Sequence, residues 1–150
     1  RFFNTVGPRQ TGTYGMVIPN FVSKALMNET IKVHGDGEQT RCFTHVKDVV
    51  GAIDNLMNTP EAEGEVFNIG GEQEISINDL AQRVKELADS DSDIENIPYE
   101  KIYGKGFEDM RRRTPDLSKL KSYIDYEQNY YIDDILKNVI NYFRKERMMA

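Results

Sequence analysis

The 150-residue sequence predicts an α/β fold, and two observations lead to that prediction. Short runs of β-branched and aromatic residues, which are typical of strands, recur along the chain and end at turns rich in glycine or proline. Between them lie longer runs whose apolar residues recur at the spacing of a helix. Strands that alternate with helices in this way are typical of α/β domains.

The composition is that of an ordinary globular protein, with 39% hydrophobic and 29% charged residues. The net charge of −6 gives no basic surface for nucleic acid or for an anionic membrane. No apolar run reaches the length that spans a bilayer. The single cysteine, Cys42, excludes an internal disulfide and fits a reducing compartment. We therefore expect a cytoplasmic protein whose partners include neither nucleic acid nor membrane.

The first elements follow from apolar patterning. Residues 1–6 form an apolar run that predicts a buried strand, and a Gly-Pro pair ends it. Residues 10–15 are polar and contain glycine, so they are predicted to form a loop. Residues 16–27 carry apolar side chains at helical spacing, with a proline in the first turn, where its missing N–H is tolerated.

A second strand is predicted at residues 31–34, where apolar and polar residues alternate. The turn at residues 35–37 reads Gly-Asp-Gly, and residues 40–46 then predict another strand. Arg41 therefore follows a tight turn on a rigid element. Its planar guanidinium suits a phosphate, but it equally suits a surface ion pair, and the motif alone leaves both readings open.

The middle of the chain predicts two helices around a strand. Residues 46–57 form the first helix, with Asp48 in the first turn, where a carboxylate favours the helix dipole. Residues 66–69 predict a strand closed by two glycines. The second helix begins at a capping box formed by Ser76 and Asp79.

The acidic run at residues 89–93 is predicted to end that helix as a solvated loop. A calcium site is the alternative for this run, but the run lacks the glycine and the closing glutamate of an EF-hand loop. The two histidines, His34 and His45, have no cysteine–histidine spacing around them that suggests a metal site. We therefore predict no metal, and we expect His45 to lie at a junction between strand and helix.

The last third of the chain predicts a strand at residues 96–99 and a loop at residues 104–110 that leads into three arginines. A short helix is expected at residues 115–122. A longer one is expected at residues 130–147, whose final turns carry basic residues that favour the dipole at a helix C-terminus.

Four runs in this sequence resemble segments of the extended short-chain dehydrogenase/reductases that act on nucleotide sugars. That family contains 4-epimerases, 4,6-dehydratases and glucuronate decarboxylases. The runs occur in the family's order: RFFNTVGPRQ at 1–10, GDGEQTRCFTHVKDVV at 35–50, EVFNIGG at 65–71 and RTPDLSK at 113–119. The resemblance covers nearly the whole chain, and it is to the C-terminal half of the family only.

The resemblance implies the C-terminal part of a Rossmann-like doubly wound sheet plus a small mixed α/β substrate-binding subdomain. Residues 1–150 would form the substrate-binding portion and contribute strands at about residues 1–5 and 65–70 to the dinucleotide-binding sheet. It also implies a nucleotide-sugar substrate, expected to be a UDP-sugar, an NAD cofactor and a homodimer. We expect the half that binds NAD to be absent from these 150 residues.

The resemblance also assigns binding roles to individual residues. Asn4, Arg41 and Arg113 would hold the diphosphate of the substrate, and Val17, in the first turn of the helix predicted at residues 16–27, would also contact the substrate there. The strand Lys32-Val33-His34 would border the base through backbone groups and a stacking side chain. On the cofactor side, the backbone of Phe3 would lie beside NAD.

Three choices remain open for these residues. Asn4 could simply turn the chain at a strand end, which is common for asparagine. Among residues 111–113 we choose Arg113 for the diphosphate, although this sequence lacks the family's commoner Arg-Pro-Gly form there. The alternative is that these arginines pair with Glu108 and Asp109.

The residues that the family needs for catalysis are missing from this chain. No glycine-rich dinucleotide turn follows a strand, and no tyrosine has a lysine four residues later within a helix. We therefore predict no catalytic residues here and no activity for the chain alone. For the full-length protein the first choice is a 4-epimerase, with a 4,6-dehydratase or a decarboxylase also open. The alternatives are a non-catalytic nucleotide-sugar-binding module or, more weakly, a structural domain whose arginines only form ion pairs.

Overall fold

The computed structural model describes residues 1–10 and 16–149. The loop predicted at residues 10–15 therefore lies, apart from Gln10, outside the described residues. The helices are α1 (Val17–Leu26), α2 (Val46–Met57), α3 (Ile77–Ala88), α4 (Tyr99–Tyr103), α5 (Ser118–Tyr123) and α6 (Ile132–Met149), with a 3-10 turn at Pro60–Ala62. The strands are β1 (Thr5–Val6), β2 (Ile31–His34), β3 (Thr40–Cys42), β4 (Thr44–His45), β5 (Glu74–Ser76), β6 (Ile94–Ile97) and β7 (Arg112–Arg113).

The described strands form small sheets that are mostly parallel. β1 pairs with β4, and β2 pairs with β6, both in parallel. The third sheet has the order β5-β3-β7, in which β5 is antiparallel and β7 parallel to β3. A parallel bridge also joins Phe2 to Ile69. The mixed α/β architecture that the sequence predicted is confirmed.

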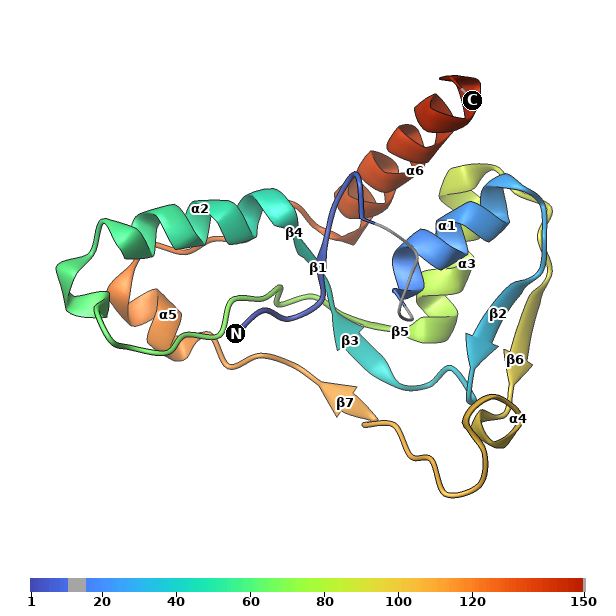
Figure 1. Ribbon diagram of the computed structural model, residues 1–150, viewed down its shortest axis with the longest axis horizontal. Helices are drawn as coiled ribbons and strands as arrows, with labels where there is room; N and C mark the ends of the chain where they lie inside the picture. Colours follow the sequence, from blue (N-terminus) through green and yellow to red (C-terminus); the bar gives the residue numbers. More distant parts are fainter. Residues whose placement is uncertain (11–15, 150) are drawn as a thin grey trace.

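Two apolar clusters hold these elements together, and they lie at different ends of the molecule (Figure 1). The first cluster lies among α1, α3, α6 and β2, and its fully buried side chains include Ile31, Leu80 and Leu136. The second joins α2 to α5 and includes Val49 and Leu120. Apolar residues at helical spacing supply both clusters, as the sequence predicted for these helices.

Caps and turns determine where several elements begin. The side chain of Ser76 accepts a hydrogen bond from the backbone N–H of Asp79 and starts α3, so the predicted capping box is confirmed. Gly35 and Gly37, between β2 and β3, have φ of 79° and 76°. A Cβ on Gly35 would lie 2.5 Å from the ring of Tyr99, so the turn needs glycine both for its backbone angle and for this close approach.

Several predicted strands differ from the observed ones. The strand predicted at residues 1–6 is limited to β1 and the bridge at Phe2, and the one at 66–69 to the bridge at Ile69. Residues 66–68 have no strand partner among the described residues, and a strand needs one. The strand predicted at residues 40–46 is divided into β3 and β4, because its two ends pair with different neighbours.

Differences also occur in the last third of the chain. The strand predicted at residues 96–99 lies earlier, as β6, and α4 takes the residues that follow it. The short helix begins three residues later than predicted, at Ser118, and the final helix begins at Ile132. The sequence analysis did not predict β5, β7 or α4. These elements are short, and their residues lack a clear periodicity.

Candidate functional site

The β5-β3-β7 sheet brings two of the predicted site residues together. Arg41 on β3 is the register partner of Arg113 on β7 and of Ile75 on β5. Successive side chains of a strand point to opposite faces, so register partners share a face. Arg112 therefore lies on the other face, where it donates to the carboxylate of Glu74 at 3.0 Å. Two arginines of different strands thus converge on one side of the sheet.

Arg41 is buried, with only 6% of its surface exposed. Its Nη1 atom donates to the carbonyl oxygens of Thr40, at 2.7 Å, and of Met110, at 2.8 Å. Its Nη2 atom donates to the carboxylate of Asp109 at 2.7 Å, which forms an ion pair. The guanidinium is therefore held rigidly, and one of its partners is an anionic oxygen.

Arg113 is exposed and contacts a third predicted site residue. Its Nη2 atom donates to Oδ1 of Asn4 at 2.7 Å. Asn4 in turn donates from Nδ2 to the carbonyl oxygen of Cys42 at 2.8 Å, next to Arg41 in β3. Its φ of 41° lies in the left-handed region, which asparagine tolerates better than most residues. Asn4 thus joins Arg113 to the backbone of β3 next to Arg41, and we call these three residues the arginine site.

The three consecutive arginines at 111–113 have other partners than the predicted Glu108 and Asp109. Arg111 pairs with Asp36 at 2.6 Å, and Arg112 pairs with Glu74. The hydrogen bond from Arg111 lowers the pKa of Asp36, and that from Arg112 lowers the pKa of Glu74. Asp109 pairs with Arg41 instead of with the triplet. The alternative in which Asp109 neutralises the triplet is therefore wrong, because chain folding brings β3 closer to it.

A second group of residues gathers where β2 ends. The Nδ1 atom of His34 lies 3.0 Å from the hydroxyl of Tyr103 in α4, and burial lowers the pKa of His34. Tyr103 stacks on Phe107 with ring centroids 4.3 Å apart. Tyr99 lies beside Phe107 and donates its hydroxyl to Asp109 at 3.2 Å. Burial, together with Asp109, raises the pKa of Tyr99 to about 12, so its hydroxyl remains a donor.

The aromatic group is therefore connected to the arginine site through Asp109, which accepts from both Tyr99 and Arg41. The sequence analysis did not name Asp109, Tyr99 or Tyr103 as site residues. The spacing of Tyr99 and Tyr103 by four positions is a signal that could have placed these two rings on one helical face. Phe107 lies beyond the end of α4, so no helical period could have placed its ring. No local signal could have paired Asp109 with a residue 68 positions earlier.

The other predicted site residues lie apart from the arginine site, and they differ in whether a ligand could reach their side chains. Lys32 is exposed on β2, whereas the side chain of Val33 is fully buried. The backbone of Val33 faces β6, because the N–H groups of Ile31 and Gly35, two residues before and after it, donate to the β6 side. On the other edge of β2, the carbonyl oxygen of His34 accepts from Nε2 of Gln39 at 2.9 Å. Val17, at the start of α1, packs against the first apolar cluster.

Phe3 was predicted to meet the cofactor through its backbone. Its N–H donates to the carbonyl oxygen of Ile69 at 3.0 Å, and its carbonyl oxygen accepts from the hydroxyl of Thr44 at 3.0 Å. Within the described residues, the glycines with positive φ between β2 and β3 precede a strand, whereas a dinucleotide turn leads into a helix. Both backbone groups of Phe3 therefore already have partners within the protein.

Two buried polar residues at the start of α2 have structural roles. His45 is the N-cap, and its Nδ1 atom accepts from the backbone N–H of Lys47 at 3.1 Å. Its ring stacks on Tyr130 with centroids 4.3 Å apart, so the predicted position at a strand–helix junction is confirmed. Asp48 is also buried, and its carboxylate accepts from the backbone N–H groups of Asn129 and Tyr130.

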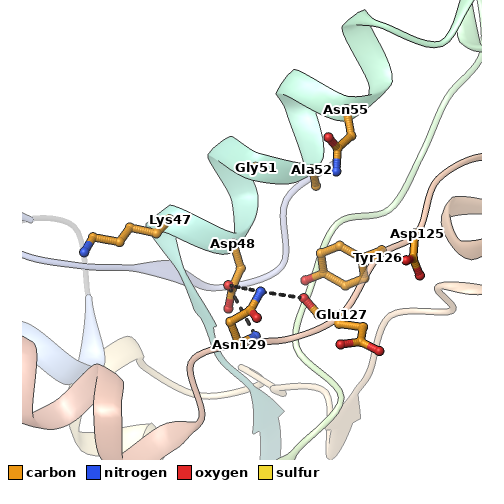
Figure 2. Close-up of a pocket in the computed structure, with 9 residues that line it drawn as sticks. All are labelled: Lys47, Asp48, Gly51, Ala52, Asn55, Asp125, Tyr126, Glu127 and Asn129. Carbon is orange, nitrogen blue, oxygen red and sulfur yellow. Dashed lines mark hydrogen bonds between the residues drawn. The ribbon is translucent and has the colours of Figure 1, made fainter.

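A hollow of about 270 Å³ lies along α2 and the segment before α6, as Figure 2 shows. Its polar residues include Lys47, Asn55, Asp125 and Glu127, and the bonds of Asp48 to Asn129 close one side. This hollow lies along α2, away from α4, which is at the opposite side of the view (Figure 1). It contains none of the residues that the sequence analysis assigned to a ligand.

Within residues 1–10 and 16–149, no group of three or more His, Cys, Asp or Glu side chains could hold a metal ion. In that part of the chain no helix has the length and apolar character needed to cross a bilayer.

Comparison with known proteins connects this geometry to a family. Residues 1–139 match the family model described as GDP-mannose 4,6 dehydratase. A UDP-N-acetyl-alpha-D-glucosaminuronate decarboxylase of Bacillus cytotoxicus is 43% identical over 146 residues, which is 97% of this chain and 45% of that protein. The chain thus spans less than half the length of this relative.

Two solved structures of nucleotide-sugar enzymes are also similar to this chain. The structure of UDP-glucose 4-epimerase from Thermotoga maritima with UDP-glucose is 33% identical, with a TM-score of 0.85, over 98% of this chain and 45% of that one. The structure of dTDP-glucose 4,6-dehydratase from Bacillus anthracis in complex with NAD is 27% identical, with a TM-score of 0.82, over 99% of this chain and 44% of that one. The Rossmann-like fold class predicted from the sequence is thereby confirmed.

Proposed function

The chain belongs to the GDP-mannose 4,6-dehydratase family, and from that premise we propose that it is the nucleotide-sugar-binding part of an NAD-dependent enzyme. In this proposal the enzyme oxidises its sugar at C4, and residues outside these 150 supply the NAD site and the catalytic base. NAD would accept the hydride when bound. The described part of this chain has no dinucleotide turn, so we assign it only the binding and orientation of the substrate.

The observation that supports this proposal best is the arginine site. The side chains of Arg41 and Arg113 lie on the same face of one small sheet, and Asn4 joins Arg113 to the backbone carbonyl of Cys42, the neighbour of Arg41. Planar guanidinium groups bind phosphate oxygens in pairs, and two of them match the two phosphates of a nucleoside diphosphate. We propose that the diphosphate of a UDP-sugar binds here.

The base would lie at the other end of the same region, beside β2. The backbone N–H and C=O of Lys32, on the edge of β2 away from β6, can donate to and accept from a uracil edge, and the ring of His34 offers a face for stacking. Lys32 also offers its exposed amine, whereas Val33 is a weaker candidate, because its side chain is buried and its backbone faces β6. We keep Val17 and Phe3 as weaker candidates, since one packs into the core and the other uses its backbone groups internally.

The names of the similar proteins help to rank the candidate reactions. The sequence analysis put a 4-epimerase first, but the Bacillus relative, at 43% identity, is a decarboxylase of a UDP-uronate. We therefore propose decarboxylation of a UDP-uronate as the first candidate. A 4-epimerase is the second candidate, because a UDP-glucose 4-epimerase shares 33% identity over 98% of the chain. Incubating the natural polypeptide with NAD and UDP-glucuronate separates them: release of carbon dioxide indicates the first, and UDP-galacturonate the second.

A substitution at Arg113 tests the binding role, with Arg112 as the matched control. Both residues are exposed on β7, but they point to opposite faces of the sheet. In the natural polypeptide, Arg113→Ala should raise the KM for the UDP-sugar by on the order of tenfold or more, because a charge-assisted contact is lost. Arg112→Ala should leave the KM within about twofold, and neither variant should change the affinity for NAD.

Two results would contradict the proposal. If Arg113→Ala and Arg112→Ala raised the KM equally, the general positive charge near the sheet would explain the effect. A specific diphosphate-binding site at Arg113 would then not be needed. A parallel loss of NAD affinity would mean that Arg113 supports the fold. The alternative, a non-catalytic nucleotide-sugar-binding module, predicts that the intact natural polypeptide has the 17.3 kDa mass of this chain and binds UDP-sugars without turnover.

A further inference from the structure

The backbone of His34, at the end of β2, is held in place by its neighbours. Its carbonyl oxygen accepts from Nε2 of Gln39 at 2.9 Å, and Gln39 is itself buried. The next residue, Gly35, donates its N–H to the carbonyl oxygen of Ile97 at 2.8 Å. With the backbone fixed in this way, the direction of the imidazole ring depends only on the side-chain torsions of His34.

Tyr103 contacts the edge of that ring. The Tyr103 hydroxyl lies 3.0 Å from Nδ1 of His34, and the two rings are T-shaped, with an interplanar angle of 71°. A hydrogen bond at a ring nitrogen lies close to the plane of the imidazole. Tyr103 therefore restricts the rotation of the His34 ring without itself covering either face. His34 is only partly buried, so its ring lies near the surface.

Aromatic contacts hold Tyr103 in place at the end of β2 (Figure 1). Tyr103 is the last residue of α4, and a helix of five residues is not stable by itself. Phe107 stacks on Tyr103 with centroids 4.3 Å apart, and it also contacts the ring of Tyr99 at 5.3 Å. Tyr99 lies against Gly35, where a Cβ would be 2.5 Å from its ring. The glycine after His34 thus seats the first turn of α4, and the helix carries Tyr103 back to His34.

This aromatic group lies at the surface of the molecule. Tyr103 and Phe107 are 51% and 44% exposed. Aromatic rings stabilise a fold mainly through the area that they bury, so this pair contributes less than a buried pair would. Its contact with His34, in contrast, has a defined direction. A role in orienting His34 therefore accounts for the contact better than a role in the core.

We propose that Tyr103 is a positioning residue for nucleotide binding, whose hydroxyl holds the imidazole of His34 in the orientation that stacks on the base. This inference rests on the proposed function, which places the base beside β2. Phe107 acts one step further away, by keeping Tyr103 in place. A ring that becomes ordered only when the base binds loses rotational freedom at that moment, whereas a ring already held does not. The contact with Tyr103 thus strengthens binding without touching the ligand.

The test is the affinity of the natural polypeptide for UDP, measured by calorimetry. Tyr103→Phe keeps the ring and its packing on Phe107 but removes the hydroxyl. It should weaken UDP binding by about threefold to tenfold, which is the usual effect of one hydrogen bond. The matched control is Tyr131→Phe, the same change at another exposed tyrosine, just before α6. It should leave the affinity within about twofold.

A double-mutant cycle with His34→Phe separates positioning from other roles of Tyr103. Phenylalanine keeps a flat ring for stacking but has no ring nitrogen, so the Tyr103 hydroxyl cannot act through it. In the His34→Phe background, Tyr103→Phe should therefore change the affinity for UDP by less than about twofold. A hydroxyl that contacted the ligand directly, or that merely stabilised α4, would give the same loss in both backgrounds.

Phe107→Leu provides a second variant in case His34→Phe does not fold. It removes the ring that stacks on Tyr103 and leaves the hydroxyl in place. In the wild-type background it should weaken UDP binding by about twofold to threefold, because Tyr103 is then held less firmly. In the Tyr103→Phe background it should have less than about a twofold effect, since the hydroxyl that it supports is already absent.

The outcomes distinguish this inference from the proposed function. If the wild type binds UDP and Tyr103→Phe binds it equally well, positioning by Tyr103 is wrong and the proposed function stands. The same conclusion follows if the loss is equal in the two His34 backgrounds, if Phe107→Leu acts equally with and without the Tyr103 hydroxyl, or if Tyr131→Phe weakens binding as much. If the wild type does not bind UDP, the proposed function fails and this inference fails with it.

Discussion

The apolar cluster among α1, α3 and α6 and the charged region around β3, β7 and α4 are built by different forces. The first contains side chains that are wholly buried, such as Val22, Leu80 and Leu136. The second contains the exposed loop at residues 104–110 and the exposed side chains of Arg111 and Arg112. The contacts at its centre are ion pairs and hydrogen bonds. The first region is thus built from apolar side chains without solvent exposure, and the second from charged groups that mostly reach the solvent.

The difference explains how each region can serve the protein. Burial of apolar surface is non-directional and strong in sum, and a packed core cannot exchange its members for a ligand without leaving a cavity. Ion pairs near the surface are worth little, because water and salt compete for both partners. The exposed pairs of Arg111 with Asp36 and of Arg112 with Glu74 therefore add little stability, whereas the apolar cluster supplies the rigid support.

The largest expected effect is in the apolar cluster. Leu80→Ala should destabilise the protein by about 2–5 kcal/mol, because Leu80 is fully buried and its removal leaves a cavity. Urea unfolding followed by circular dichroism measures this loss. Met57→Ala, on the 81% exposed side chain at the end of α2, is the control and should stay within about 0.5 kcal/mol. A loss below about 1 kcal/mol for Leu80→Ala would contradict the contrast between the regions.

An intermediate effect on stability is expected at His45. This residue is buried but polar, so it belongs neither to the apolar cluster nor to the charged region. Burial lowers the pKa of His45 from its ordinary value of 6.5. As pH falls, the unfolded chain therefore takes up a proton before the folded chain does. Stability is fully present above about pH 6.5 and falls below it, by at most about 1.4 kcal/mol per pH unit for one histidine.

Two histidine variants check that assignment. His45→Asn keeps a side chain that can cap α2 but does not titrate, so it should remove part of the fall in stability between about pH 6.5 and 5. Burial also lowers the pKa of His34, which contributes with the same sign, and His34→Asn should remove the remainder. Asp36 and Glu74, whose pKa values are lowered by arginines, titrate in a more acidic range. A pH profile that neither substitution changes would contradict the assignment.

The smallest effect is expected at the border of the two regions. Ser76 ends β5 in the charged sheet and caps α3 in the apolar cluster. Ser76→Ala should cost about 1 kcal/mol, because one backbone donor of the helix loses its partner. Thermal unfolding measures this cost, and Ser76→Asp, which restores a capping oxygen, should recover most of it. Failure of Ser76→Asp to recover stability would show that the hydroxyl is not acting as a cap.

Local sequence patterns predicted the helices of the apolar cluster well. The spacing of apolar residues located α1, α2, α3 and α6 to within a few residues, because the same side chains that set the period are those that become buried. The capping box at Ser76 was equally local. These predictions depend on residues that are near one another in the sequence, and tertiary structure did not change them.

The charged region could be predicted only in part. The resemblance to a family named Asn4, Arg41 and Arg113, and the structure brings these three together. The two-residue strand β7 carries no pattern of its own and exists because β3 pairs with it. Its partners, like those of Arg41, come from distant parts of the chain. Sequence reasoning could thus name residues of the site but not their contacts.

The sequence by itself determined the α/β class, the buried faces of the long helices, the cap of α3 and the family. Only the tertiary structure decided which acidic residue pairs with which arginine, that Asp109 lies on Arg41, and that α4 places Tyr103 beside His34. The physical reason is the range of the forces. Periodicity and capping act within a few residues, whereas the partner of an exposed charge is chosen by whichever segment the fold brings nearest.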